Sequence, residues 1–394
     1  MRVTTPTIFN GIQNNLQNLA EDLQRVNASI SSGKKYQRIS DNPLDVGAIL
    51  GLNKEGSQTA QFERNLETAK GWLNVTESTM QNITDIVQAS SALANQMATG
   101  TYNADQRQAA AEQIQGYLEE VMQEGNNQYN GQYVLAGYRT DSPPFTEGDW
   151  QVQPPVMHLT SGSSGTAVSG GAYTGTTSRT YLLEMVSGGG TGVGTYRVSV
   201  DGGQNWTDPA TIPAGPVSLG DGVQVTLGGT WNAGDRFSIP VYQPIEYRGD
   251  NNNFEIAIET QNRMVINEVG SAAVGGDQGN NDLIQILAQL KSSLEANDPG
   301  DVGASLDKLR SYETHSTSIL ASLGSSLDRV GMKENVYGSL KDEITQQISD
   351  RGDTDLVTAI SLLNTRENAY QAALLSSSKV MSMSLMDYLG TSAA

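Results

Sequence analysis

The residue types that most often bind metals or transfer protons are rare in this chain. It has two histidines, His158 and His315, in segments of different composition, and no cysteine. Neither histidine has a metal-binding partner at the four-residue spacing of a helical metal site. Without cysteine, disulfides and thiolate metal sites are excluded. We therefore expect two ordinary polar histidines, no metal and no cofactor.

Phosphate and calcium motifs are absent in the same way. The glycine-rich run 188–194 lacks the Gly-Lys-Ser/Thr ending of a phosphate-binding loop and does not match G-x-G-x-x-G in register. The turn 201–203 lacks the ligand spacing and closing glutamate of an EF-hand. The many carboxylates fall in no recognisable catalytic signature. The sequence therefore predicts that the chain is not an enzyme, with a hydrolase as the least favoured alternative.

Two motifs leave a binding function open. Arg-Gly-Asp occurs at 248–250 and at 351–353, where it could bind a host receptor or form turns between elements. Trp150, Trp206 and Trp231 could stack on carbohydrate in an adhesive module. The alternatives, turns and buried aromatic side chains of a β core, are favoured in both cases.

The charge of the chain excludes some partners. The formal net charge is −19, and no lysine lies between Lys70 and Lys291. Nucleic acid and anionic membranes both require clustered basic residues, so neither is expected as a partner. The run Met1 to Pro6 leads into a polar segment without the apolar core of a Sec signal, and no apolar run approaches membrane-spanning length. We expect a soluble protein that, if secreted, uses no recognisable cleaved signal.

Composition divides the chain into helical ends and a Gly/Pro-rich centre, which holds nine of the 12 prolines. This predicts an α+β multidomain fold, a long α-helical bundle or coiled coil from both chain ends with an inserted β domain. The expected parts are a terminal coiled-coil domain (1–45 and 350–394), a helical rod with a β-hairpin (46–140 and 248–349), and an outer β domain (141–247).

Heptad spacing marks one apolar row at each end of the chain. The N-terminal row, before a C-capping Gly33, consists of Ile12, Leu16, Leu19, Leu23, Val26 and Ile30. The C-terminal row consists of Leu356, Ile360, Leu363, Tyr370, Leu374, Met381 and Leu385. Neither row can close a core locally, and an isolated helix of this length is marginal in water. We therefore expect both rows to pair with each other and with other subunits, and to be disordered in the free monomer.

The same spacing continues in the rod. A second row runs from Phe62 to Met97, and a long return helix carries another from Leu306 to Ile348. Gly324, Gly331 and Gly338 recur every seven residues beside the row of the return helix. Either a neighbouring helix packs closely on these glycines, or their spacing is accidental. Asn130-Gly131 predicts a hairpin turn.

Alternating residues predict the strands of the centre and of the return to the rod. Strands are expected at 196–200, at 223–227 and at 237–239, the last ending at an edge or strand end marked by Pro240. A further hairpin is expected within 254–266.

Several segments resemble the bacterial flagellins and flagellar hook-associated proteins. At the N-terminus these are Met1 to Pro6, Ser32 to Lys35 and Ser40 to Pro43, with Asn42 where the family usually has aspartate. The run Gly131 to Thr140 is more particular, and resembles the hook-associated protein 3 family where its helical body leads into the outer domain. Leu323 to Val330, Asp355 to Ile360, Tyr370 to Leu374 and Ser384 to Leu389 agree with the same family.

The resemblance implies a structural role at the junction between the flagellar hook and filament. Members of this family form a ring of identical subunits, between an adjacent hook-associated protein and flagellin. They are exported unfolded to the cell exterior through the flagellar type III channel without signal cleavage, and a cytoplasmic chaperone holds the C-terminal region beforehand. A flagellin-type filament subunit is the main alternative, because the two kinds of protein share their termini.

Overall fold

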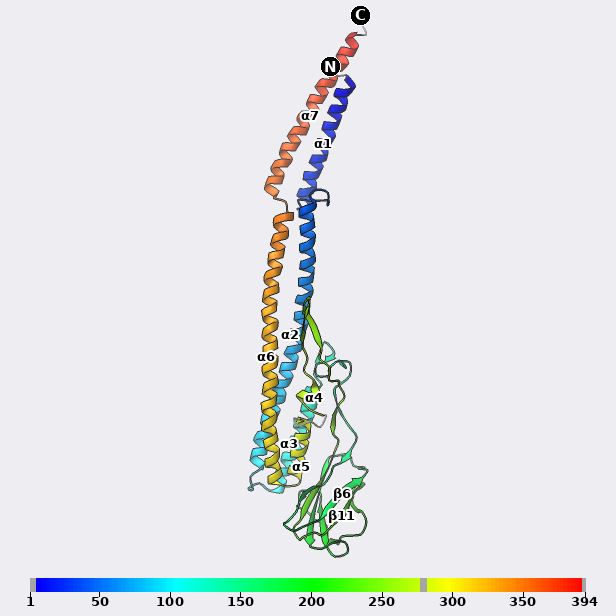
Figure 1. The fold of residues 1–394 in the computed structure, drawn as a ribbon, viewed down its shortest axis with the longest axis vertical. Coiled ribbons are helices and arrows are strands. Elements are labelled where there is room, and N and C mark those ends of the chain that lie inside the picture. The colour runs from blue at the N-terminus through cyan, green and yellow to red at the C-terminus, as the bar shows by residue number, and fades with distance from the viewer. Residues whose placement is uncertain (1–4, 277–281, 392–394) are drawn as a thin grey trace. The chain divides into compact units, whose positions relative to one another are not determined.

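The computed structural model describes the backbone of residues 5–276 and 282–391, and the side chains of 9–276 and 282–382. It confirms the predicted α+β organisation, in which helices at both chain ends flank a central region of strands (Figure 1). The helices are α1 (Thr5–Ser32), α2 (Pro43–Met97), α3 (Ala104–Gly125), α4 (Gly270–Ala273), α5 (Leu283–Glu295), α6 (Pro299–Gly352) and α7 (Leu356–Thr391).

The chain separates into two compact units, residues 1–64 with 334–394 and residues 65–333. The first unit contains α1, α7, the start of α2 and the end of α6, and the second contains the remaining elements. The three-part division predicted from composition stays a prediction.

The second apolar row forms the buried face of α2. Leu66, Ala69, Met80, Ile83 and Val87 are fully buried, as heptad spacing predicts. Other contacts join α2 to α6 within each unit. In the first unit the Phe62 and Tyr337 rings stack at 5.7 Å between centroids, and in the second the Thr84 and Ser316 hydroxyls are hydrogen-bonded at 2.6 Å. The two long helices therefore share a core with a few buried polar contacts.

The three heptad-spaced glycines of α6 have no close neighbour within the described residues. A Cβ atom added at Gly324, Gly331 or Gly338 would meet nothing within 4 Å. A neighbouring helix of the same chain therefore does not pack closely on this stripe.

Short hairpins join the rod helices to the strands. Asn103 caps α3 by a capping box with Gln106, and Asn130 and Gly131 adopt positive φ angles of 52° and 80° between β1 (Gln128–Tyr129) and β2 (Gln132–Tyr133). The hairpin turn predicted at Asn130-Gly131 is therefore confirmed. The second predicted hairpin is also present, as β14 (Glu255–Glu259) and β15 (Asn262–Val265).

The central strands form two antiparallel sheets around one apolar core. The smaller sheet has the order β10-β11-β6, and the larger has the order β4-β12-β7-β8-β9, with β5 also paired to β12. A separate pair, β3 (Phe145–Glu147) and β13 (Ile245–Tyr247), connects this region to the rod. The sheet strands are β4 (Gln151–Val152), β5 (Val156–His158), β6 (Thr166–Gly171), β7 (Arg179–Ser187), β8 (Thr195–Ser199), β9 (Ala210–Thr211), β10 (Val217–Gly220), β11 (Val223–Gly228) and β12 (Arg236–Tyr242).

The predicted position of Pro240 is wrong. It lies inside β12 and pairs with Thr180 of β7, although proline cannot donate to a sheet ladder. Its carbonyl accepts a hydrogen bond from the Gln153 N–H at 2.8 Å, on the side of β12 where the pairing changes from β5 to β4. The nitrogen and carbonyl of one strand residue point to the same side, so the missing N–H faces this interruption of the ladder.

A buried carboxylate fixes one end of the larger sheet. Asp235 is fully buried and accepts hydrogen bonds at 2.6–2.7 Å from the Thr160 N–H and hydroxyl, the Ser163 hydroxyl and the Asn232 N–H. Burial raises the pKa of Asp235, but these hydrogen bonds outweigh it and hold the pKa below its ordinary value. The loop 160–163 is thereby attached to the start of β12.

Candidate assembly surface

The N-terminal row is the partly covered face of α1. All six of its residues, from Ile12 to Ile30, are half-buried, and the polar positions between them are mainly exposed. The helix that packs against α1 is α7, which lies beside it (Figure 1). Asp22 of α1 and Arg366 of α7 add an ion pair at 3.1 Å between the two helices. The expected pairing of the two ends with each other is therefore present in a single chain.

The C-terminal row is divided between two faces of α7. Leu363 and Tyr370 are half-buried, whereas Leu356, Ile360, Leu374 and Met381 are 45–51% exposed. Leu385 belongs to α7, but its side chain lies outside the described residues. The exposed apolar row of α7 is defined here as Leu356, Ile360, Leu374 and Met381.

A different heptad row of α7 is the more covered one. It consists of Ala359, Leu363, Arg366, Tyr370, Ala373 and Ser377, at spacings of four and three, and Ala359 and Ser377 are buried. Small side chains at these positions let the helix backbones approach. This spacing is visible in the sequence, but the predicted row was chosen by its large apolar residues. The predicted row therefore lies part of a turn away from the more covered face of α7.

The α1–α2 connection and the α6–α7 connection are joined to each other within the first unit. The Lys35 N–H donates to the Gly352 carbonyl at 2.7 Å, and the Thr354 N–H donates to the Gly33 carbonyl at 2.8 Å. Lys34 forms an ion pair with Asp353 at 2.6 Å, and its ammonium group holds the pKa of Asp353 below the ordinary value. The α1–α7 pair and the α2–α6 pair therefore both end at one joint, which these contacts hold together.

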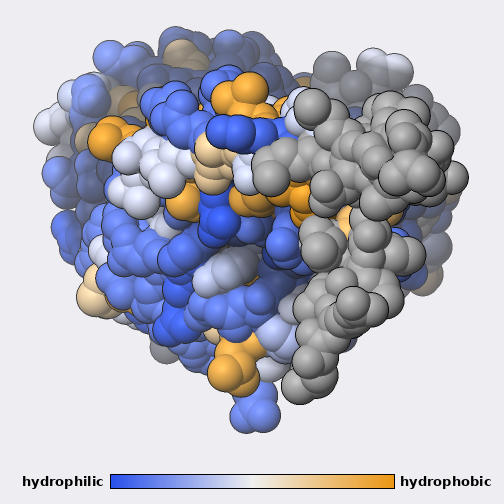
Figure 2. All heavy atoms as spheres, turned by 90° about the horizontal axis from the view of Figure 1, so that it is seen from above, coloured by the Kyte–Doolittle hydropathy of each residue, from blue (hydrophilic) through white to orange (hydrophobic). Residues whose placement is uncertain are grey.

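Exposed apolar side chains also occur near this joint in the sequence, and the sequence analysis did not identify them. Ile39, Leu44, Leu50 and Val357 are 58–86% exposed. Figure 2, a view from above relative to Figure 1, shows hydrophobic residues as separate patches in a mainly hydrophilic surface. Isolated apolar side chains are common on surfaces, whereas larger contiguous apolar patches mark interaction sites.

The tryptophans do not form a shared binding platform. Trp231 is 1% exposed and stacks on Phe237 in the β core, while Trp150 packs against Tyr173. Trp206 lies under the Arg197 guanidinium at 4.4 Å. The alternative of buried or packed aromatics therefore fits the structure better than a carbohydrate-stacking surface.

The Arg-Gly-Asp motifs lie where elements end. Asp250 follows β13 and accepts hydrogen bonds from the Tyr138 and Asn252 N–H groups, both at 2.9 Å. Asp353 follows α6 and is occupied by Lys34. The carboxylates that a receptor would bind are already used within the chain.

One hollow of about 630 Å³ lies in the second unit, among α3, α5, β7 and β12. Its buried charges, Lys291 and Glu295, pair with each other at 2.9 Å, and Glu295 accepts from the Thr180 hydroxyl at 2.6 Å. These groups hold α5 against the sheet. None of the helices in the described ranges has an apolar stretch long enough to cross a bilayer.

Comparison with known proteins finds a match for the N-terminal helical region. Residues 3–140 match the family model of the bacterial flagellin N-terminal helical region. Over these residues the chain is similar to the bacterial flagellins. The match covers α1, α2, α3 and the first hairpin, so it includes the N-terminal row and the joint.

Individual relatives are distant. The flagellar hook-associated protein 3 of Salmonella typhimurium is 24% identical over 148 residues, covering 37% of this chain and 47% of that protein. The flagellar filament 41 kDa core protein of Borreliella burgdorferi is 24% identical over 162 residues, covering 41% of this chain and 48% of that protein. The chain therefore spans about half the length of these relatives.

The crystal structure of Bacillus cereus FlgL is similar over 76% of this chain and 99% of that one, at 12% identity and a TM-score of 0.45. At that score the likeness does not establish a common fold.

Proposed function

We propose that the chain is a structural subunit of the bacterial flagellum, located at the junction between hook and filament. The observation that carries the proposal is the exposed apolar row of α7, on a helix already paired with the flagellin-like N-terminal helix. The name of the Salmonella relative, a hook-associated protein, supports the junction in particular. The proposed activity is mechanical assembly, without catalysis.

In this proposal the exposed row binds the terminal helices of neighbouring subunits. Fully burying an aliphatic side chain contributes about 1.5–3 kcal/mol, and each of Leu356, Ile360, Leu374 and Met381 still has about half of that area to bury. The row therefore supplies roughly 4 kcal/mol to each contact. That is modest for one pair of subunits, and repetition around a ring of identical subunits makes it sufficient.

The proposed partners come from the resemblance to the flagellar hook-associated proteins. We infer a homo-oligomeric ring, with an adjacent hook-associated protein on one side and flagellin on the other. Nucleic acid and membrane are not proposed as partners, because the net charge is −19. The location is the cell exterior, reached by export without signal cleavage. Before export, a cytoplasmic chaperone at the C-terminal region would cover the exposed row of α7.

Deletion of the gene tests the location. Without a junction protein, cells should build hooks and release flagellin monomers into the medium, because the filament has no attachment. Immunoblots of culture supernatant and electron microscopy of the hooks measure both. Bare hooks with no released flagellin would overturn the junction proposal.

A filament subunit is the second candidate, and the similarity to the Borreliella filament protein favours it. In that case the deletion should remove the main protein of sheared filaments. Mass spectrometry of filaments from wild-type cells separates the two, since a junction protein is present at a small number of copies per filament.

A further inference from the structure

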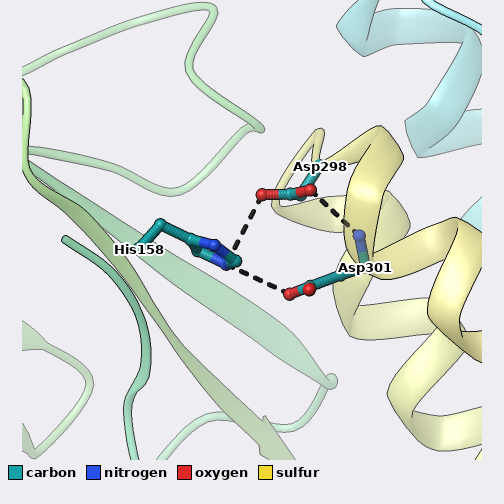
Figure 3. A group of neighbouring side chains, drawn as sticks. All are labelled: His158, Asp298 and Asp301. Atoms are coloured by element: carbon teal, nitrogen blue, oxygen red, sulfur yellow. Dashed lines mark hydrogen bonds and ion pairs between the residues drawn. The ribbon is translucent and has the colours of Figure 1, made fainter. Parts of the chain in front are cut away.

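His158 lies among charged groups that no sequence spacing brings near it. It ends strand β5, and its Nε2 atom is 3.1 Å from Asp301 Oδ2 and 3.4 Å from Asp298 Oδ2. Asp298 and Asp301 come from the start of α6, 140 or more positions later in the chain. Figure 3 shows the imidazole ring pointing between the two carboxylates.

Hydrogen bonds hold one of these carboxylates in place. Asp298 caps α6, because its Oδ1 atom accepts from the Gly300 N–H at 2.8 Å and the Asp301 N–H at 3.1 Å. Its other oxygen, Oδ2, remains directed at the imidazole. Asp301 stands one helical position beyond Gly300 and offers Oδ2 to the same ring nitrogen.

A direct hydrogen bond satisfies only part of this arrangement. The neutral ring can carry one proton on Nε2, and one N–H serves one acceptor well. The 3.1 Å contact with Asp301 fits such a bond, but the 3.4 Å contact with Asp298 exceeds the usual range. Two carboxylates beside one imidazole also leave at least one uncompensated negative charge. A divalent cation would balance both carboxylates.

The spacing of the three atoms suits a metal ion. Zn²⁺ binds imidazole nitrogen and carboxylate oxygen at about 2.0–2.2 Å, so neighbouring ligands of a tetrahedral site are roughly 3.3–3.6 Å apart. The 3.4 Å distance from Nε2 to Asp298 falls within that range, and the 3.1 Å distance to Asp301 is slightly shorter. One ligand atom from each residue lies within 4.8 Å of the others. The side chains are 28–43% exposed, which leaves room for water to complete the coordination.

We propose that His158, Asp298 and Asp301 bind a divalent transition-metal ion, with Zn²⁺ as the representative. Imidazole with carboxylate oxygen is a ligand set that suits Zn²⁺ and its first-row neighbours. The ion would attach β5 of the larger sheet to the N-terminus of α6 inside the second unit. The positive end of the helix dipole opposes a cation there, so the binding is weaker than in a closed structural zinc site.

Calorimetric titration of the full-length chain with Zn²⁺, after removal of any histidine tag, tests the site. The wild-type chain should bind one ion, and His158→Asn should raise the Kd at least about 10-fold. At a hundredfold excess over the Kd, Zn²⁺ should raise the Tm of the wild-type chain by about 5 °C, and EDTA should reverse the rise.

The second histidine provides a matched control. His315 contacts the Ala272 carbonyl at 2.9 Å through Nε2 and is not part of the cluster, so His315→Asn should bind Zn²⁺ like the wild type. Circular dichroism without metal shows whether each variant is folded, and Asp301→Asn supplies a second variant if His158→Asn is not. Equal affinities of wild type and His158→Asn, or no Zn²⁺-dependent rise in Tm, would overturn the metal site and leave a simple hydrogen-bonded cluster.

Discussion

Leu374→Asp is the substitution that most directly tests assembly through the exposed row of α7. Leu374 is 45% exposed, so about half of its burial is already present in the single chain. Losing that half destabilises the α1–α7 pair by about 1 kcal/mol. On assembly the carboxylate would enter an apolar contact without a partner. The lost burial and the desolvation of the charge together reach about 3 kcal/mol or more, which lowers the association constant at least about 100-fold.

Circular dichroism of the purified chain measures the destabilisation of the α1–α7 pair. Motility and filament counts by electron microscopy measure the loss of assembly. Leu374→Ala loses only the apolar area, about 1 kcal/mol, so it should leave partly functional filaments. Val193→Asp is the control, because Val193 is 71% exposed and lies outside the terminal helices. Leu16→Asp should also abolish filaments, but Leu16 belongs to the half-buried N-terminal row, so that variant loses the α1–α7 pair as well. Normal filaments from Leu374→Asp would refute the proposed role of the exposed row.

Two further predictions concern buried polar groups. Asp235→Asn should destabilise the β domain by about 2–4 kcal/mol at pH 7, because an amide cannot accept all four hydrogen bonds. Since the pKa of Asp235 is lowered in the folded state, its stabilisation is full above the unfolded-state pKa of about 4 and is lost as pH falls. The difference in denaturant midpoint between the wild type and Asp235→Asn, followed by Trp231 fluorescence, should therefore close in acid. A difference that stays constant with pH would contradict stabilisation by the Asp235 carboxylate. Thr84→Val should cost about 1–3 kcal/mol in thermal unfolding, because it leaves the buried Ser316 hydroxyl without its 2.6 Å partner. The double variant with Ser316→Ala should recover part of this loss, and a double variant as unstable as the sum of the single ones would show that the hydroxyl pair is not the cause.

The sequence predicts features of this fold that depend on near neighbours. Gly33 ends α1 with a φ of +68°, and Asn130-Gly131 turns the first hairpin, because each conformation is set within a few residues. Heptad spacing likewise predicts the buried face of α2 and the half-buried face of α1, since 3.6 residues per turn fix which side chains share a side.

Features that depend on distant partners could not be obtained in this way. On α7, periodicity offers several adjacent rows, and only the approach of α1 selects the row with Ala359 and Ser377 over the row with Leu374. Pro240 is tolerated within β12 because two other strands change over opposite its nitrogen. His158 meets Asp298 and Asp301 only after the β domain folds beside the start of α6. The missing information in each case is the identity of the neighbour.

The glycines of α6 show how the free chain and the assembly can differ in their requirements. Gly324, Gly331 and Gly338 lie inside a helix, where each lowers stability by about 1 kcal/mol relative to alanine, and an added Cβ would meet nothing within 4 Å. We therefore predict that each Gly→Ala variant raises the unfolding free energy of the purified chain by about 1 kcal/mol, measured by denaturant unfolding. Gly56→Ala serves for comparison, because its Cβ would lie 3.5 Å from Ile344. An unchanged or lowered midpoint would mean that the chain itself fills the space beside the stripe. If the stabilised variants still form normal filaments, the seven-residue spacing is accidental. If they do not, the stripe contacts a neighbouring subunit, because stability of the single chain has been gained and only the assembled state has lost space.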